Sequence, residues 1–263
     1  ECQVNPAYMK KDCAPVCFSC DYLSVETRCP IDPNAPNVFG PGDIGLMFQK
    51  LTSEPFLSEY SVEILSKPPE PWVIQMDNVL SKEEAETMIE LAFEEGFEQS
   101  ADVGKLNADG TFESNFNDGR TSTNTWCENA CYEHEVAKRI NERLSNFTGV
   151  PHNNSEHLQL LRYEPGQYYR RHHDYIAFHQ KRQQGVRVLT FYLYLNDVEA
   201  GGGTNFPKLN ITVTPKQGRA VLWPNVYVEK PERADGRTEH QALPVEKGIK
   251  FGANAWFHMR DFI

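Results

Sequence analysis

The stretch Gln167-Tyr168-Tyr169-Arg170-Arg171-His172-His173-Asp174 decides how the rest of this sequence is interpreted. On an extended strand, side chains alternate between two faces, so His172 and Asp174 point to the same side while His173 points away. One imidazole and one carboxylate are then aimed at the same point. A further histidine from a facing strand, for which His240 is the candidate, would complete the two-histidine, one-carboxylate set that holds non-haem Fe(II) with open coordination positions.

The segments between these residues predict that the chain returns to this point. Residues 187–195 and 219–223 are apolar runs typical of buried β-strands, and residues 201–204 form a glycine-rich turn. In a rolled antiparallel sheet, His240 can come back to face His172 and Asp174. The His-x-Asp spacing is weak support by itself, because the chain has eight histidines. The strand pattern around it is what favours a metal site.

Length and charge restrict the class of protein. With 263 residues, 40% of them hydrophobic, the chain can form one core and an appendage. A formal net charge of −11 argues against a general nucleic-acid surface. No apolar run approaches the length of a membrane span, and none resembles a signal peptide. Because the chain begins at Glu1 instead of methionine, we expect a processed start, which leaves a preceding signal or anchor open.

Seven cysteines are distributed unevenly, with five before residue 30 and the other two at Cys127 and Cys131. A zinc site in the first group lacks a nearby histidine, so disulfides are favoured. Cys127 and Cys131 flank the start of a predicted helix and are candidates to pair, although a bridge across one regular helical turn is strained. Asn-x-Ser/Thr acceptors also occur, and with the disulfides they predict the secretory pathway, in particular the lumen of the endoplasmic reticulum. The acceptors are Asn146, Asn153 and Asn210.

We divide the chain into a cysteine-rich segment at 1–29, a proline-rich arm at 30–71 and a main domain at 72–263. Part of the arm is expected to pack on the main domain through its apolar residues, Leu46, Met47, Phe48 and Leu51. In the main domain, a first strand is predicted at residues 72–76.

Two helices and one loop are also predicted in the main domain. Ser81 and Glu84 form a capping box that opens a helix through about Glu95, with an apolar stripe at Ala85, Met88, Ile89 and Ala92. A second helix is expected at 129–147 and ends before Gly149. The polar residues 99–118 are predicted to form a loop that acts as a lid.

From Leu158 to the end, the chain resembles the prolyl 4-hydroxylases, a branch of the Fe(II)- and 2-oxoglutarate-dependent dioxygenases. The motifs that carry the resemblance are LQLLRYEPGQYYRRHHD, RVLTFYLYLNDVEAGGGTNFP, GRAVLWPN, TEHQALPVEKGIK and NAWFHMR. The resemblance implies an α+β fold whose core is a double-stranded β-helix of the jelly-roll or cupin type, with flanking helices. The N-terminal segment resembles part of a ShK toxin-like module through Cys13, Cys17 and Cys20, although the earlier cysteines of that module are missing.

The resemblance implies that His172, Asp174 and His240 are the iron ligands and that 2-oxoglutarate chelates the metal through its keto-acid end. Lys250 matches the residue that pairs with the far carboxylate, and a buried lysine needs such a partner; a solvated lysine is the alternative. Three further residues match positions that line the cosubstrate pocket, with core packing as the alternative for the two aromatic ones. They are Tyr163, Thr204 and Trp256.

Six residues match positions near the peptide in this family: Arg120, Trp126, Glu156, Tyr169, Arg187 and His258. The expected substrate is a proline-rich or collagen-like peptide. A polyproline-II ligand has no internal hydrogen bonds, so a groove can hold its carbonyls with Arg187 and stack its rings on Tyr169 or Trp126.

The activity that the resemblance implies is peptidyl-proline 4-hydroxylation, coupled to oxidative decarboxylation of 2-oxoglutarate to succinate with O2, and L-ascorbate rescues oxidised iron. His173 departs from the family, in which an aromatic residue is frequent at this position. Two alternatives stay open: an oxygenase acting on another residue or a small molecule, and a non-catalytic secreted binding protein with a relic metal site. The intact His172, Asp174, His240 and Lys250 favour an enzyme.

Overall fold

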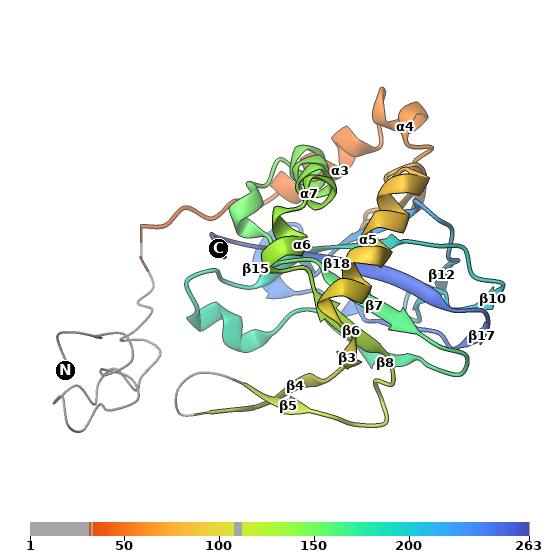
Figure 1. Ribbon diagram of the computed structural model, residues 1–263. Helices are drawn as coiled ribbons and strands as arrows, with labels where there is room; N and C mark the ends of the chain where they lie inside the picture. Colours follow the sequence, from red (N-terminus) through yellow and green to blue (C-terminus); the bar gives the residue numbers. More distant parts are fainter. Residues whose placement is uncertain (1–31, 33, 108–111, 263) are drawn as a thin grey trace, which may run out of the picture.

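The computed structural model describes residue 32 and residues 34–107 and 112–262. The cysteine-rich segment 1–29, with its expected likeness to a ShK module, lies outside the described residues. In the described part, a large sheet carries helices on one side and a smaller sheet on the other (Figure 1). This layering is the one expected for a jelly roll with flanking helices.

The larger layer is an eight-stranded antiparallel sheet with the order β1-β2-β13-β9-β18-β7-β6-β3. Its central strands are the longest, and they come from the segments that the sequence predicts to be buried. The bounds are β1 Glu63–Ser66, β2 Val73–Met76, β3 Glu98–Gln99, β6 Thr123–Trp126, β7 Gln159–Tyr163, β9 Arg187–Tyr194, β13 Ala220–Pro224 and β18 Lys250–His258.

The smaller layer is a four-stranded antiparallel sheet with the order β12-β11-β16-β8. Its strands are β8 Tyr169–His172, β11 Thr204–Phe206, β12 Ile211–Val213 and β16 His240–Ala242. Two short pairs adjoin the sheets, namely β10 Ala200–Gly201 with β17 Val245–Lys247, and β14 Val226–Tyr227 with β15 Lys230–Ala234.

Most residues of β9 are apolar or aromatic because both faces of the strand are buried, and Arg187 and Thr190 are the exceptions. Leu189, Phe191 and Leu193 pack into the cluster beneath the helices, whereas Tyr192 and Tyr194 belong to a second cluster between the two sheets. A strand buried on both faces is built largely from apolar or aromatic residues. The tyrosine hydroxyls are therefore buried inside the jelly roll, where the candidate site lies.

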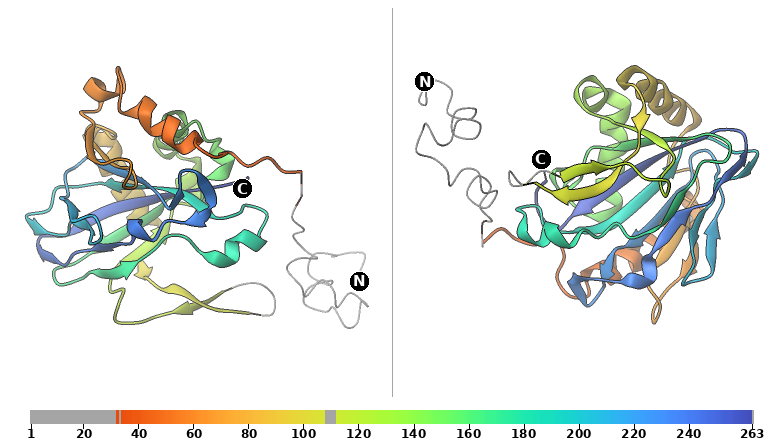
Figure 2. Two further views of the ribbon diagram at one scale, coloured as in Figure 1. Left: turned by 180° about the vertical axis from the view of Figure 1, so that it is seen from behind. Right: turned by 90° about the horizontal axis from the view of Figure 1, so that it is seen from below.

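The helices that cover the larger sheet are α5 Lys82–Glu95 and α7 Glu135–Thr148 (Figure 2). The predicted capping box of α5 is present: Ser81 Oγ accepts from the Glu84 amide at 3.1 Å, and Glu84 Oε2 accepts from the Ser81 amide at 3.0 Å. Ala85, Met88 and Ala92 of the expected stripe are buried, Ile89 is partly buried against the core, and Leu91 joins them. Glu84 also receives hydrogen bonds from Arg143 of α7 at 2.7 and 2.8 Å, so one carboxylate caps α5 and joins it to α7.

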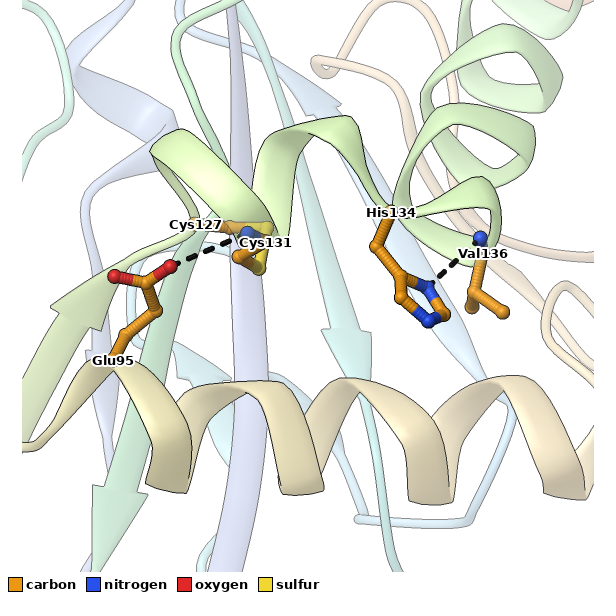
Figure 3. The surroundings of a disulfide bond; sticks show 5 residues. All are labelled: Glu95, Cys127, Cys131, His134 and Val136. Carbon is orange, nitrogen blue, oxygen red and sulfur yellow. Dashed lines mark hydrogen bonds between the residues drawn. A yellow bond between two sulfur atoms is a disulfide. The ribbon is translucent and has the colours of Figure 1, made fainter.

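The helix expected at 129–147 is two helices, α6 Asn129–Glu133 and α7. His134 lies between them in an extended conformation, and its Nδ1 accepts from the Val136 amide at 3.2 Å as the cap of α7 (Figure 3). Cys127 precedes α6 and forms a disulfide with Cys131 inside it. Because Cys127 lies outside the helix, this pairing spans no regular helical turn. Gly149 ends α7 in the left-handed region, as predicted.

The proline-rich arm contributes regular structure to the main layers. It contains α3 Asp43–Leu51, α4 Phe56–Glu59 and the edge strand β1. Met47, Phe48 and Leu51 pack into the core as expected, but the expectation for Leu46 is wrong, because that side chain is 63% exposed. A stripe at three- and four-residue spacing faces the sheet, and Leu46 lies off it.

The region predicted as a polar loop at 99–118 contains a β-hairpin, β4 Asp102–Leu106 with β5 Phe112–Asn115. The hairpin extends away from the body of the protein beneath β3 and β8 (Figure 1). Its strands are polar on most faces, which explains why alternation of apolar residues did not reveal them. The described helices include none that is long and apolar enough to cross a membrane.

Candidate active site

The two histidines of the candidate metal site are cross-strand partners. β16 pairs with β8 in a register that sets His240 directly opposite His172. The sequence predicted that they would meet across facing strands; they meet instead on neighbouring strands of the smaller sheet. Side chains directly opposite each other in an antiparallel pair are within contact distance, and the two ring centroids are 4.3 Å apart.

Asp174 completes the cluster from just beyond the end of β8. Its Oδ1 lies 3.7 Å from His172 Nε2, and its Oδ2 lies 3.7 Å from His240 Nε2. One donor atom from each of the three residues lies within 4.8 Å of the others. The polypeptide leaves the strand at His173, so Asp174 reaches this point from a bend and not from the regular alternation that the sequence predicted.

Backbone carbonyls orient both imidazoles. His172 Nδ1 lies 2.8 Å from the Arg170 carbonyl oxygen, and His240 Nδ1 lies 3.0 Å from the Thr238 carbonyl oxygen. A carbonyl only accepts, so each Nδ1 carries the proton, and each Nε2 lone pair points toward Asp174. This second hydrogen bond is the arrangement that fixes the tautomer of metal-binding histidines.

The Asp174 carboxylate is held by Thr190, which is held in turn by Asn225, and neither residue was predicted from the sequence. Thr190 Oγ1 donates to Asp174 Oδ2 at 2.8 Å, and Asn225 Nδ2 donates to Thr190 Oγ1 at 2.9 Å. Thr190 and Asn225 are fully buried. A threonine within the otherwise apolar or aromatic residues 188–195 was the available signal, because a buried hydroxyl needs a partner.

The protonation states suit a divalent cation. Burial and the adjacent His240 lower the pKa of His172 to about 3, and burial lowers the pKa of His240. Burial opposes ionisation of Asp174, but His240 and His172 outweigh it and hold the pKa of Asp174 below its ordinary value. Two neutral imidazoles and one carboxylate are the ligand forms that bind metal.

His173 is not part of this cluster. Its Nε2 lies 3.0 Å from the Asp235 carbonyl oxygen, and its Nδ1 accepts from the Tyr175 amide at 2.9 Å. Both ring nitrogens are thus engaged with backbone groups, so His173 is not a metal ligand, as predicted, although it lines the same cavity as His172 and Asp174.

A cavity of about 330 Å³ opens onto His172 and Asp174. Five residues predicted to lie near a peptide or cosubstrate line its walls: Arg120, Trp126, Tyr169, Arg187 and Trp256. A second cavity, of about 410 Å³, lies beside the β4–β5 hairpin and shares Trp126 and Gln159 with the first. Two residues of the metal cluster, His172 and Asp174, therefore line a depression that extends toward the hairpin.

Aromatic and cationic side chains stack along these walls. The Tyr169 ring lies on His172 with a centroid separation of 3.7 Å, and the Arg120 guanidinium lies 4.6 Å from the Tyr169 ring centroid. On the opposite wall, the Arg187 guanidinium is 3.7 Å from the Trp256 ring centroid. Such stacking fixes flat side chains in place before any ligand binds.

Glu156, Arg187 and His258 form one buried ionic network. Glu156 accepts hydrogen bonds from Arg187 Nε and, at 2.8 Å, from Arg187 Nη2. His258 lies between Glu156 Oε1 at 2.7 Å and the Gly185 carbonyl oxygen at 2.8 Å, so its ring joins the carboxylate to the backbone. Burial alone would raise the pKa of Glu156, but Arg187 and His258 lower it to about 2. Glu156 and His258 therefore act by positioning Arg187.

Lys250 lies between the two sheets and is not one of the residues that line that depression. It is only 1% exposed, and its Nζ has no hydrogen-bond partner among the described residues. The rings of Tyr163, Tyr192 and Tyr194 surround it, with centroids 4.8 to 5.4 Å from Nζ. Burial without a counter-charge lowers the pKa of Lys250 to about 7.

Two of the three other predicted cosubstrate residues lie near Lys250. Tyr163 is its cross-strand partner on β7, and Thr204 accepts a hydrogen bond from Tyr194 at 2.7 Å. Trp256 lies six positions further along β18 and lines the depression beside the metal ligands, about 20 Å from Lys250 along the strand at the rise of an extended chain. The Trp256 ring packs against the Arg187 guanidinium, so Trp256 belongs to the wall of the depression.

The profile of the 2OG-Fe(II) oxygenase superfamily matches residues 158–258. "Probable prolyl 4-hydroxylase 8" of Arabidopsis thaliana is 32% identical over 222 residues, which are 76% of this chain and 72% of that protein. This chain belongs to the prolyl 4-hydroxylase family of 2OG-Fe(II) oxygenases. Prolyl 4-hydroxylase subunit alpha-1 of Gallus gallus is 33% identical over 199 residues, 72% of this chain and 36% of the relative. The chain thus spans about a third of the length of that curated relative.

Among solved structures, a viral collagen prolyl hydroxylase of Paramecium Bursaria Chlorella virus-1, in its 2OG complex, is similar with a TM-score of 0.56. The sequences are 28% identical, and the match covers 71% of this chain and 95% of that one. This likeness confirms the jelly-roll fold. Members of this prolyl 4-hydroxylase family use Fe(II), 2-oxoglutarate and O2, and the residues of this chain fit both the metal and the cosubstrate. The three donor atoms suit the metal, and the unpartnered Lys250 ammonium suits a buried carboxylate.

Proposed function

We propose that this protein hydroxylates C4 of proline residues in a proline-rich or collagen-like peptide, coupled to decarboxylation of 2-oxoglutarate to succinate. The observation that carries the proposal is the convergence of His172, Asp174 and His240 beside a depression that His172, Asp174, Arg187 and Trp256 line. These three residues would hold a metal there, and the metal would supply the oxidising chemistry.

The residues of the chain would hold and orient the reactants. His172, Asp174 and His240 would bind the metal, and His172 and Asp174 line the depression where the reactants would meet it. Lys250, with Tyr163 and Thr204 nearby, binds the far carboxylate of 2-oxoglutarate. The sheet on either side excludes water from this pocket, and exclusion of water strengthens the pairing of ammonium and carboxylate.

The walls of the depression suit an extended peptide. Arg187 is held by Glu156 and keeps donor groups available to a peptide carbonyl, while Tyr169 and Trp126 offer faces for proline rings. The second cavity continues the depression past Trp126 toward the β4–β5 hairpin, so residues beyond the reacting proline have a place to lie. Arg120 supports this wall through its contact with Tyr169.

The proposal is tested by incubating purified protein with Fe(II), 2-oxoglutarate, O2 and ascorbate in the presence of Pro-Pro-Gly repeats and other proline-rich peptides. The expected product gains the mass of one oxygen atom, and amino-acid analysis identifies 4-hydroxyproline with an equal amount of succinate. His240→Ala should abolish turnover, whereas His152→Gln, a histidine that contacts Tyr132 outside the depression, should retain it. Oxygen insertion into a different residue, or succinate without any peptide product, would overturn the assignment of substrate.

We also propose a secretory location, in the lumen of the endoplasmic reticulum, and L-ascorbate as the reductant that restores oxidised iron. The Cys127–Cys131 disulfide supports an oxidising compartment. Asn146, Asn153 and Asn210, the acceptors of the three sequons, are all exposed. Peptide mapping before and after glycosidase treatment of protein from a eukaryotic secretory host tests this, and three unmodified asparagines would count against it. The cysteine-rich segment at 1–29 is proposed to be a ShK-like module.

A further inference from the structure

Lys250 Nζ and Tyr192 Oη are among the buried polar atoms in the interior of the jelly roll that lack partners within the described part of the chain. Tyr192 is 6% exposed and Lys250 1% exposed. The Lys250 ammonium lies 4.8 Å from the centroid of the Tyr192 ring, so the two side chains are neighbours in the same pocket. The role of Lys250 follows from the family, but that of Tyr192 does not.

The strand register explains why the Tyr192 hydroxyl reaches this place. Tyr192 on β9 pairs with Asn254 on β18, and its ring leans along β18 toward Gly252, two residues from Lys250. A Cβ built at Gly252 would overlap the Tyr192 hydroxyl. The missing side chain at this position is therefore what admits the hydroxyl between the two strands, on the face of β18 that carries Lys250.

The other two tyrosines around Lys250 are satisfied within the protein. Tyr194 Oη donates to Thr204 Oγ1 at 2.7 Å and lies 3.1 Å from the Val213 carbonyl oxygen. Tyr163 shares a hydrogen bond with Ser122. Of the three hydroxyls, only that of Tyr192 has no partner among the described residues.

An unpaired hydroxyl and an unpaired ammonium, both buried, are each unfavourable by more than a typical hydrogen bond contributes. A phenylalanine would fill the position of Tyr192 without that penalty. Both groups are donors, so one acceptor with two oxygen atoms would satisfy them together. A carboxylate is such an acceptor, and its charge matches that of the ammonium.

We infer that the Tyr192 hydroxyl donates a hydrogen bond to the same far carboxylate of 2-oxoglutarate that the Lys250 ammonium binds, with Gly252 providing the space. This inference rests on the proposed function, because it takes the cosubstrate from it. Tyr192 is thereby a binding residue that discriminates dicarboxylates from 2-oxo acids with an apolar end. Its contribution is a hydrogen bond to a charged group, the stronger class.

The test compares wild type and Tyr192→Phe by calorimetric titration with Fe(II) in the absence of oxygen. The two ligands are 2-oxoglutarate and 2-oxopentanoate, in which a methyl group replaces the far carboxylate. For 2-oxoglutarate, Tyr192→Phe should raise Kd about tenfold to a hundredfold. For 2-oxopentanoate, the two proteins should bind within about twofold of each other, because no hydrogen bond to that end is lost.

A second readout separates binding from structure. Tyr192→Phe removes an unpaired hydroxyl, so ligand-free protein should unfold at the same urea concentration as wild type or a higher one. Tyr194→Phe is the matched contrast: it deprives Thr204 and the Val213 carbonyl of their donor, and should lower the unfolding midpoint of the ligand-free protein. Gly252→Ala, which displaces the Tyr192 hydroxyl, should weaken 2-oxoglutarate binding as Tyr192→Phe does.

The outcomes distinguish the inference from the function on which it rests. If wild type fails to bind 2-oxoglutarate, the proposed function fails. If wild type binds and Tyr192→Phe binds equally well, or loses affinity for both ligands alike, only the role of Tyr192 is overturned. A ligand-free Tyr192→Phe protein that is less stable than wild type would show a structural hydroxyl and would overturn it as well.

Discussion

At the scale of single residues, the hydrogen bonds behind Asp174 decide how well the metal is held. Thr190→Val keeps the shape of the side chain but removes the hydroxyl that donates to Asp174 and accepts from Asn225. Because residues that orient metal ligands are typically worth about tenfold to a hundredfold in affinity, we expect Fe(II) or Mn(II) binding to weaken by this factor. Metal titration measures it, and Thr190→Ser, which keeps the hydroxyl, is the control. Unchanged affinity in Thr190→Val would show that Asp174 needs no orienting donor.

The titration of Lys250 predicts how cosubstrate binding depends on pH. Burial lowers the pKa of Lys250 from 10.5 to about 7 in the ligand-free protein. Below pH 7 the lysine already carries the proton that a carboxylate requires; above pH 7, binding must take up a proton, so affinity should fall about tenfold per pH unit. Calorimetry in two buffers of different ionisation enthalpy measures the uptake. Binding of 2-oxopentanoate should lack this component, and an equal slope for both ligands would contradict the assignment.

At the scale of elements, Glu84 joins α5 to α7. Its hydrogen bonds from Arg143 lower the pKa of Glu84 from 4.5 to about 2, against burial, which raises it. Stability from this carboxylate is therefore present above pH 4.5 and is lost as the pH falls toward 2. Glu84→Gln keeps an oxygen for the capping box but removes the charge, and should lower the free energy of unfolding by about 2 kcal/mol at pH 7. Urea unfolding across this pH range should show the difference shrinking in acid, and a constant difference would contradict it.

Local sequence signals predicted the elements that depend on local interactions. The capping box of Ser81 and the glycine end of α7 at Gly149 are both present, because each is a contact between residues close in sequence. The break at His134 was missed, since it depends on one side chain capping the following helix. The β4–β5 hairpin was missed because its polar residues lack the alternation that marks a strand.

At the scale of the molecule, the sequence predicted which groups meet but not all that surrounds them. His172 and His240 could be matched because the motif marks both, and strand register then sets them opposite each other. Thr190 and Tyr192 were read only as parts of a buried strand. Their importance comes from partners on β13, β18 and the loop after β8, and such long-range pairings cannot be read from one strand. The domain boundary at residue 71 stays a prediction, although β1 from the arm pairs with β2 of the main domain.

The site also joins the two layers, so its occupation should stabilise the whole protein. The metal ligands come from β8, β16 and the bend after β8, while Lys250 belongs to β18 of the larger sheet. A ligand that binds only the folded state at about a hundred times its Kd adds about 2.7 kcal/mol to the free energy of unfolding. Adding Mn(II) and 2-oxoglutarate to chelator-treated protein should therefore raise Tm by several degrees, measured by calorimetry.

Two variants separate the contributions to this increase in Tm. His172→Ala should lose the response to metal and cosubstrate together, because the metal anchors one end of the 2-oxoglutarate. Lys250→Met should keep the response to Mn(II) alone, because the metal ligands are unchanged. It should lose most of the added effect of 2-oxoglutarate, because the far carboxylate then lacks its ammonium partner. If 2-oxoglutarate raised Tm equally in wild type and Lys250→Met, the cosubstrate would not span the two sheets, and Lys250 would be a buried lysine of the core.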